Sequence, residues 1–330
     1  MTAPDPTSPD VHPAIVGEAA RLLADPEARA RLSDHRAITA RGTASERLAY
    51  FALSRSLSPH TEAVRNRLLQ GLPTQPGPLD QLTIERESGV LVTDQSAWPV
   101  VAQAVDEART CFARAGRAGG DNPGKLFMTT AKLHRPLDSQ VMALARHPSV
   151  LRLVGRYLGG LPVLFRINLL DSANEALQPD SSQFFHVDPE DFRQVKIFLL
   201  VEDVDEDSGP LHLLRVGASD TVQVTRGHRH GRVADHEVMA VCSANDLIAC
   251  MGRAGTLAIG DTSRCFHFGS RPGRRRRHVV MFQYLSAFAS AYPLTATACG
   301  GKYAAPVQER AAMLQREVGE LDAYLFGICR

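Results

Sequence analysis

Residues 184–192 read FFHVDPEDF and place a histidine and an aspartate one residue apart, behind two aromatic side chains. On an extended strand, residues i and i+2 point to the same side, so His186 and Asp188 would present an imidazole and a carboxylate to one face. The pair alone carries little weight, because chance supplies on the order of one His-x-Asp pair in a chain with 12 histidines and 21 aspartates. Its meaning therefore depends on the sequence around it.

The sequence after Pro162 changes to short β-rich runs, and the pair lies in one of them. Glycine, proline, aspartate and serine separate these runs, which is typical of an all-β sandwich or jelly roll. The runs are PVLFRINLL (162–170), SQFFHVD (182–188), QVKIFLLVED (194–203), GPLHLLRV (209–216), GTLAIGD (255–261) and RRHVVMFQYL (276–285).

The flanking regions have the composition of helices. Residues 1–80 are rich in alanine, leucine, arginine and glutamate, and a Pro/Gly joint, PTQPGP, lies near their end at 73–78. Apolar residues at helical spacing predict a helix over 101–112. A second helix is expected over 137–160, which ends in paired glycines, and a last one over 306–327. We therefore expect a mainly β jelly-roll core with helices packed before and after it.

The composition narrows the classes of function. The chain carries 37 basic and 36 acidic residues, a balance that argues against a nucleic-acid partner. Its six cysteines are scattered without a C-x-x-C pair, which suits free thiols in the cytoplasm. The start, MTAPDPTSPDVHP, has no signal-peptide pattern and reads as a disordered tail, and no apolar run approaches the ~20 residues that span a bilayer. We expect a cytoplasmic protein without a membrane partner.

A third metal ligand for the pair has to come from another strand. His267 follows the run GTLAIGD and lies 81 positions after His186, enough chain for a roll to return to its first strand. Iron(II) oxygenases often hold their metal with two histidines and one carboxylate, leaving positions open for co-substrate and oxygen. Taken alone, His267 is more simply explained as a core or loop histidine without a metal.

An arginine run opens the last β segment. Arg277, Val279, Met281 and Gln283 share one face of the predicted strand RHVVMFQYL. An arginine at the mouth of an apolar barrel can bind a carboxylate through two parallel hydrogen bonds, which suits the distal end of a 2-oxo dicarboxylate. The run 274–277 alone can also be a solvated charge cluster or a nucleic-acid patch, and its neighbours Arg275 and Arg276 leave the register open.

The order of the segments HVD, SGPLHLL, GTLAIGD, CFHFGS and RHVVMFQYL resembles the phytanoyl-CoA dioxygenase-like family of iron(II)/2-oxoglutarate oxygenases, over roughly 200 residues. The resemblance implies a double-stranded β-helix, the jelly-roll fold of cupins. It also implies His186, Asp188 and His267 as Fe(II) ligands, and Arg277 and Asn168 as contacts to 2-oxoglutarate. Two features depart from the family pattern: LRVGASD lacks a histidine that relatives often have, and the serine after the distal histidine comes one place later.

The function implied is that of a 2-oxoglutarate-dependent dioxygenase. It would use O2 to hydroxylate or otherwise oxidise a small-molecule metabolite, for example in secondary metabolism, and would release succinate and CO2. The alternative is a non-redox, cupin-like protein that binds a metal or a small molecule on the same fold. The expected division is a tail with a helical extension (1–80), the oxygenase domain (81–290) and a C-terminal helical segment (291–330). The N-terminal helices would cover the active site, form the interface of a homodimer, or both.

Overall fold

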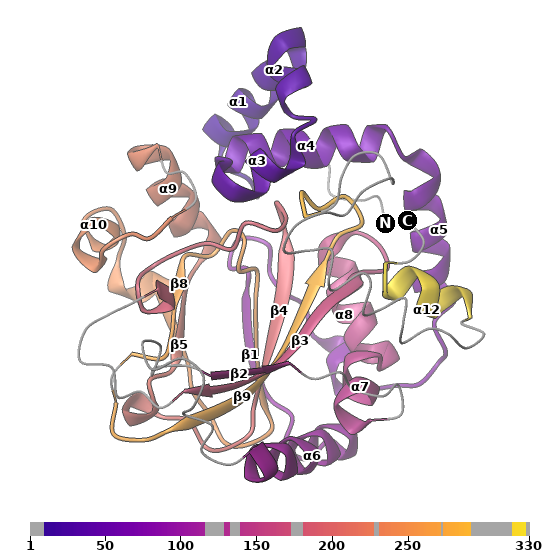
Figure 1. The fold of residues 1–330 in the computed structure, drawn as a ribbon, viewed down its shortest axis with the longest axis vertical. Helices are drawn as coiled ribbons and strands as arrows, with labels where there is room; N and C mark the ends of the chain where they lie inside the picture. The colour runs from indigo at the N-terminus through magenta and orange to yellow at the C-terminus, as the bar shows by residue number, and fades with distance from the viewer. Residues whose placement is uncertain are drawn as a thin grey trace.

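Two antiparallel sheets make up the core of the chain (Figure 1). The computed structural model describes residues 10–115, 129–132, 139–172, 181–227, 231–271, 273–291 and 319–327. In this part of the chain the major sheet has the order β1 (Val90–Asp94), β7 (Thr256–Gly260), β4 (Gln194–Leu200), β9 (Arg277–Leu285), β3 (Val163–Ser172) and β2 (Thr129–Lys132). The minor sheet has the order β6 (Leu247–Cys250), β5 (Leu211–Leu214) and β8 (His267–Phe268). The expected mainly β jelly-roll core is confirmed.

Side-chain alternation divides the core into an inner and an outer layer. On β4, Val195, Ile197 and Leu199 pack in the cluster that the helices cover, whereas Phe198 and Leu200 point into the roll. The inner layer joins both sheets, because its cluster also contains residues of β9, β5 and β6. The interior of the roll is therefore apolar where the sheets meet, and polar side chains on its inward face need a separate reason.

Helices cover the roll on several sides. The five N-terminal helices are α1 (Pro13–Ala24), α2 (Pro26–Arg31), α3 (His35–Arg41), α4 (Ala44–Ser56) and α5 (Pro59–Gln70). Their core includes Phe192 and Phe288 of the roll, so the extension is packed on it. Helices α6 (Pro99–Ala115), α7 (Gln140–Ala145) and α8 (Pro148–Leu158) pack on the outer face of the major sheet. Helices α9 (Val216–Arg226) and α10 (Asp235–Met239) lie beside the minor sheet (Figure 1).

The single helix expected over 137–160 is wrong, because the structure has two helices there, α7 and α8. Pro148 has no N–H to continue the first helix, and the residue before a proline avoids the helical region. His147 is accordingly extended, and its Nδ1 accepts a hydrogen bond from the backbone N–H of Ser149, which caps the second helix. The expected stop at the paired glycines is confirmed, since Gly159 closes α8 with a φ of 83°.

The strand expected over 182–188 is wrong in extent. A short 3-10 turn covers Ser181–Gln183, and pairing is then limited to the bridges Phe185–Val233 and His186–His267 in the described residues. The partner strand β8 is only two residues long, and Pro189 has no N–H to extend the ladder. The segment is therefore a brief extended contact and not a full strand.

Five described strands and α-helices were not expected from the sequence: β2, β6, β8, α9 and α10. The α9 sequence VGASDTVQVTR is poor in helix-forming residues, and the helix is held by the burial of Val216 and Val222. Of the expected helix over 306–327, the described part forms α12 (Glu320–Leu325). The expected disordered tail over 1–13 is wrong at its end, because Asp10 pairs with two buried arginines, Val11 is buried and α1 begins at Pro13. Residues 1–9 of this tail lie outside the described residues. Within the described chain, no helix combines the length and the apolar character needed to cross a bilayer.

Candidate metal centre

His186, Asp188 and His267 come together at one place inside the roll. One ligand atom from each of the three side chains lies within 4.8 Å of the others. The backbone sets this arrangement. His186 and His267 form an antiparallel bridge with N–H···O distances of 3.0 and 2.9 Å, and the Asp188 N–H donates to the carbonyl of Thr262 at 2.8 Å. The structure therefore brings the three residues predicted as metal ligands together.

Both imidazoles are oriented by a backbone carbonyl two residues earlier. Nδ1 of His186 lies 2.9 Å from the carbonyl oxygen of Phe184, and Nδ1 of His267 lies 3.0 Å from that of Cys265. A carbonyl oxygen only accepts hydrogen bonds, so each Nδ1 carries the proton and each Nε2 keeps its lone pair free. This is the arrangement that metal-binding histidines need, with the second ring nitrogen held by a partner.

The electrostatics of the group suit a divalent cation. Burial, followed by the charge of the neighbouring His267, lowers the pKa of His186 well below its usual value. Burial also lowers the pKa of His267. Burial alone would raise the pKa of Asp188, but the Lys196 ammonium at 2.7 Å and the two histidines hold it well below its usual range. Two neutral imidazoles and one carboxylate result, the protonation state in which these groups bind a metal.

Arg277 lies at the start of β9 and points into the same roll. Its side chain is 7 % exposed, and Nη2 donates to Oγ of Ser270 at 3.0 Å. Its Nε is buried without a hydrogen-bond partner, and no ion pair joins it to another described residue. Burial lowers the pKa of Arg277 to about 10, so the guanidinium stays charged at neutral pH. A buried cation that no described acidic residue neutralises can bind an anion.

The other members of the arginine run point outward. Arg274 lies 3.9 Å from Asp207, and Arg275 and Arg276 pair with acidic residues of neighbouring segments. Their side chains are 85 %, 51 % and 38 % exposed, which contrasts with buried Arg277. Of the four arginines, Arg277 is thus the one that faces the interior.

Asn168 lies in the middle of β3, opposite Met281 of β9 in the register. It shares the inward face of its strand with Leu170, which packs in the inner cluster. Asn168, the second residue predicted to contact 2-oxoglutarate, therefore lies on the inward face of the major sheet, between the positions of Arg277 and Gln283 along the strands.

Two residues of this region were not predicted from the sequence. Lys196 of β4 contacts Asp188. Ser270, with a φ of 56°, accepts a hydrogen bond from Arg277, and its hydroxyl shares a second hydrogen bond of 2.8 Å with the hydroxyl of Ser172. A signal for Lys196 was present, because it is the single charge inside the apolar run QVKIFLL. Alternation places it on the inward face together with Phe198, where a lysine has no reason to lie without a partner.

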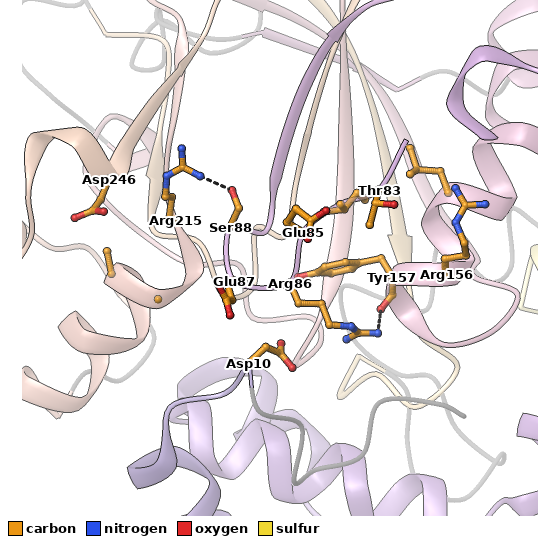
Figure 2. Close-up of a pocket in the computed structure, with 14 residues that line it drawn as sticks. Asp10, Thr83, Glu85, Arg86, Glu87, Ser88, Arg156, Tyr157, Arg215 and Asp246 are labelled. Atoms are coloured by element: carbon orange, nitrogen blue, oxygen red, sulfur yellow. Dashed lines mark hydrogen bonds between the residues drawn. The ribbon is translucent and has the colours of Figure 1, made fainter. Parts of the chain in front are cut away.

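A groove of about 1050 Å³ lies elsewhere, on the outside of the roll (Figure 2). The turn 83–88 before β1, helix α8 and the start of α9 line it, and Arg215 donates to the neighbouring hydroxyl of Ser88. None of the five predicted site residues lines this groove. It is therefore separate from the metal centre, although Tyr157 in its wall donates to Asp261 at the beginning of the loop that leads to His267.

No family model and no curated protein matches the chain. Solved structures do match. The non-heme alpha ketoglutarate dependent epimerase SnoN from nogalamycin biosynthesis is 18 % identical, with 61 % of this chain and 79 % of that chain covered and a TM-score of 0.42. EctD from S. alaskensis with 2-oxoglutarate and 5-hydroxyectoine is 17 % identical over 61 % of this chain and 73 % of that chain, with a TM-score of 0.45. The non-heme monooxygenase ThoJ is 15 % identical over 63 % and 77 %, with a TM-score of 0.42. Likeness of this degree does not define chemistry, so the function has to follow from the site residues.

Proposed function

We propose that this chain is an Fe(II)- and 2-oxoglutarate-dependent dioxygenase that hydroxylates or otherwise oxidises a small-molecule metabolite. One observation carries the proposal. A His-Asp-His group and the buried guanidinium of Arg277, which no acidic residue among the described residues pairs with, lie in the same roll. The group suits a metal ion, and the guanidinium suits the far carboxylate of a chelating co-substrate.

The metal would be held by Nε2 of His186, Nε2 of His267 and a carboxylate oxygen of Asp188. Such a triad occupies one face of the ion and leaves the remaining positions open. When bound, Fe(II) and 2-oxoglutarate supply an oxidation by O2 in which 2-oxoglutarate becomes succinate and CO2 and the substrate is oxidised. The chain contributes the fixed imidazole tautomers and a carboxylate kept ionised by Lys196.

The co-substrate would be held by Arg277 and Asn168 from the major sheet. Nε and Nη2 of Arg277 can both donate to one carboxylate, and Ser270 holds the guanidinium in place. Asn168 would offer its side-chain amide at the inward position of β3 next to Leu170, which packs in the apolar inner cluster. The apolar side chains between them exclude water from the bound molecule.

Three further parts of the proposal concern the protein as a whole. The cysteines of the described residues are free thiols, which supports a cytoplasmic location. We retain O2 as a co-substrate and a homodimer through the N-terminal helices as proposals. We also retain the division into an N-terminal extension (1–80), the oxygenase domain (81–290) and a C-terminal segment (291–330).

The test is anaerobic titration of the protein with Fe(II) and then with 2-oxoglutarate, followed by visible absorption and by succinate formation in air. We expect a charge-transfer band that needs both additions. His267→Ala and Asp188→Ala should lower Fe(II) affinity by more than about a hundredfold. Arg253→Ala, an exposed residue far from the roll interior, is the matched control. Full turnover in the two ligand variants would contradict the proposal. Fe(II) binding without the band would favour the non-redox metal-binding protein.

A further inference from the structure

A row of three polar side chains crosses the inner face of the major sheet. Arg166 of β3 lies opposite Gln283 of β9, and Gln283 lies opposite Lys196 of β4. By strand alternation, all three share the inward face with the apolar residues of the inner cluster. The two cations are two strand spacings apart, about 10 Å at their Cα atoms, so their long side chains can reach a common group.

The middle residue of the row is fixed. Gln283 is 1 % exposed, and its Nε2 donates to Oε1 of Gln194 at 2.8 Å. Gln194 in turn donates to Oγ1 of Thr262 at 2.9 Å, in the loop before His267. This amide chain makes Gln283 a rigid spacer between the two cations and sets their separation.

Lys196 brings one end of the row to the metal centre. Its ammonium contacts Oδ2 of Asp188 at 2.7 Å, and the same oxygen lies 3.6 Å from Nε2 of His267. A metal ion held by the two histidines and this carboxylate would take over the negative charge that Lys196 neutralises. The ammonium would then be a cation next to the metal centre without its acidic partner.

Arg166 forms the other end of the row. Its guanidinium makes no ion pair with another described residue, and its Cζ lies 5.3 Å from the centroid of the Phe165 ring. Two other arginines inside the molecule have several acceptors: Arg65 donates to two backbone carbonyls, and Arg264 pairs with two carboxylates. A half-buried arginine on the inward face of a sheet, without an acidic partner among the described residues, is unusual because desolvating its charge is costly.

The charges of the four side chains Arg166, Lys196, Arg277 and Asp188 do not balance, because three are positive and one is negative. A divalent metal ion and the 2-oxoglutarate dianion would cancel each other, so their binding would leave the excess of two positive charges among these four side chains unchanged. A low-dielectric interior disfavours such an excess unless a further anion enters.

We propose that the substrate of this site is an anionic small molecule, whose carboxylate or phosphate group is bound by Arg166 and Lys196 across Gln283. The proposal rests on the proposed function, because it places the anion beside the metal centre and away from Arg277. It names the chemical class of substrate: an acidic metabolite that is held by its anion while a neighbouring carbon is oxidised.

The experiment measures binding to protein loaded anaerobically with Fe(II) and saturating 2-oxoglutarate. Phenylacetate, phenyl phosphate and the neutral phenylacetamide are compared by saturation-transfer NMR on the wild type, Arg166→Gln and Arg166→Lys. Saturating 2-oxoglutarate keeps the proposed Arg277 site filled, so the probes report binding at Arg166 and Lys196. Arg215→Gln is the control, since Arg215 belongs to the separate outer groove (Figure 2).

We expect one or both anions to bind more tightly than the amide. Arg166→Gln should weaken that binding by about ten- to a hundredfold, Arg166→Lys should restore part of it, and Arg215→Gln should leave it unchanged. Which anion binds identifies a carboxylate or a phosphate substrate. Equal binding of the amide, no binding of either anion, or anion binding that survives Arg166→Gln would overturn the proposal. The charge-transfer band, recorded on the same samples beforehand, reports separately whether the proposed function fails.

Discussion

The Lys196 ammonium lies 2.7 Å from Oδ2 of Asp188, and the two side chains are only 12 % and 13 % exposed. The same oxygen faces Nε2 of His267 at 3.6 Å. A metal ion and the lysine therefore contend for one carboxylate oxygen. In the metal-free protein, Lys196 supplies the positive charge that keeps the buried carboxylate of Asp188 ionised. The metal-free protein is therefore more stable than it would be without this lysine.

Lys196→Met should therefore change the metal-free and metal-loaded proteins unequally. The metal-free variant loses the partner of a buried carboxylate and should be destabilised by about 2–4 kcal/mol. With metal bound, Asp188 has its cation again, so most of that loss should disappear. Thermal unfolding with and without Mn(II) measures the effect, and the Mn(II)-induced rise in Tm should be larger in the variant. Arg253→Met removes an exposed pair with Asp94 and serves as control. An equal Mn(II)-induced rise in Tm in Lys196→Met and Arg253→Met would contradict a competition between the metal ion and Lys196 for Asp188.

Arg277→Met should raise stability while it abolishes co-substrate binding. The guanidinium is buried, its Nε has no partner, and burial lowers its pKa to about 10, all signs of an unfavourable environment for a charge. Methionine fills a similar volume without that cost, so we expect about 1–2 kcal/mol more stability without ligand. Added 2-oxoglutarate should raise the Tm of the wild type and leave the Tm of Arg277→Met unchanged. Arg276→Met, which removes a surface ion pair, should keep the 2-oxoglutarate response. A variant that is less stable and still responds would show that Arg277 is structural.

The fold could be predicted where a local pattern matches the final environment. The apolar runs at 194–203 and 276–285 became β4 and β9 because alternation suits a strand between two packed layers. The helix α9 could not be predicted in this way, since its residues favour other conformations and its burial depends on distant partners. The break between α7 and α8 was present in the sequence as Pro148 and follows from the chemistry of proline.

The site shows the same division between local and distant information. The spacing of His186 and Asp188 suggested a common face, and the structure brings His267 to it through a backbone bridge that no local pattern specifies. The start of β9 decides which arginine of the run is buried: Arg276 stays exposed, and Arg277 is buried. The ion pair of Lys196 could not be predicted, because it joins two segments whose distance is set by the fold.

His278 should give the protein a pH-dependent stability. Burial alone would lower the pKa of His278, but hydrogen bonds to Asp171 and Glu202 raise it above its usual value. A histidine with a raised pKa stabilises the fold fully below its unfolded pKa of about 6.5, and this contribution is lost as pH rises through the folded pKa. His278→Gln should therefore lower the free energy of unfolding at pH 6 and leave it unchanged at pH 9. The difference should not exceed about 1 kcal/mol, because the pair is partly exposed to solvent. Urea unfolding at both pH values measures it, with exposed His236→Gln as control. A loss of the same size at both pH values would contradict the electrostatic origin.

Asp10 should hold the N-terminal extension on the roll. Its carboxylate accepts from Arg193 at 2.6 Å and from Arg264 at 2.8 Å, and all three side chains are at most 6 % exposed. Arg264 also pairs with Asp220, so the carboxylates of Asp10 and Asp220 together neutralise the buried guanidinium groups of Arg193 and Arg264. Asp10→Asn keeps the shape and removes the charge, which leaves two buried guanidinium groups with one carboxylate. We expect a loss of about 2–4 kcal/mol in urea unfolding and earlier proteolysis of the segment before α3. Glu18→Gln, in an exposed pair with Arg21, should cost less than about 0.5 kcal/mol. If Asp10→Asn is no less stable than Glu18→Gln, the buried network does not anchor the extension, and its packing rests on the apolar contacts with the roll alone.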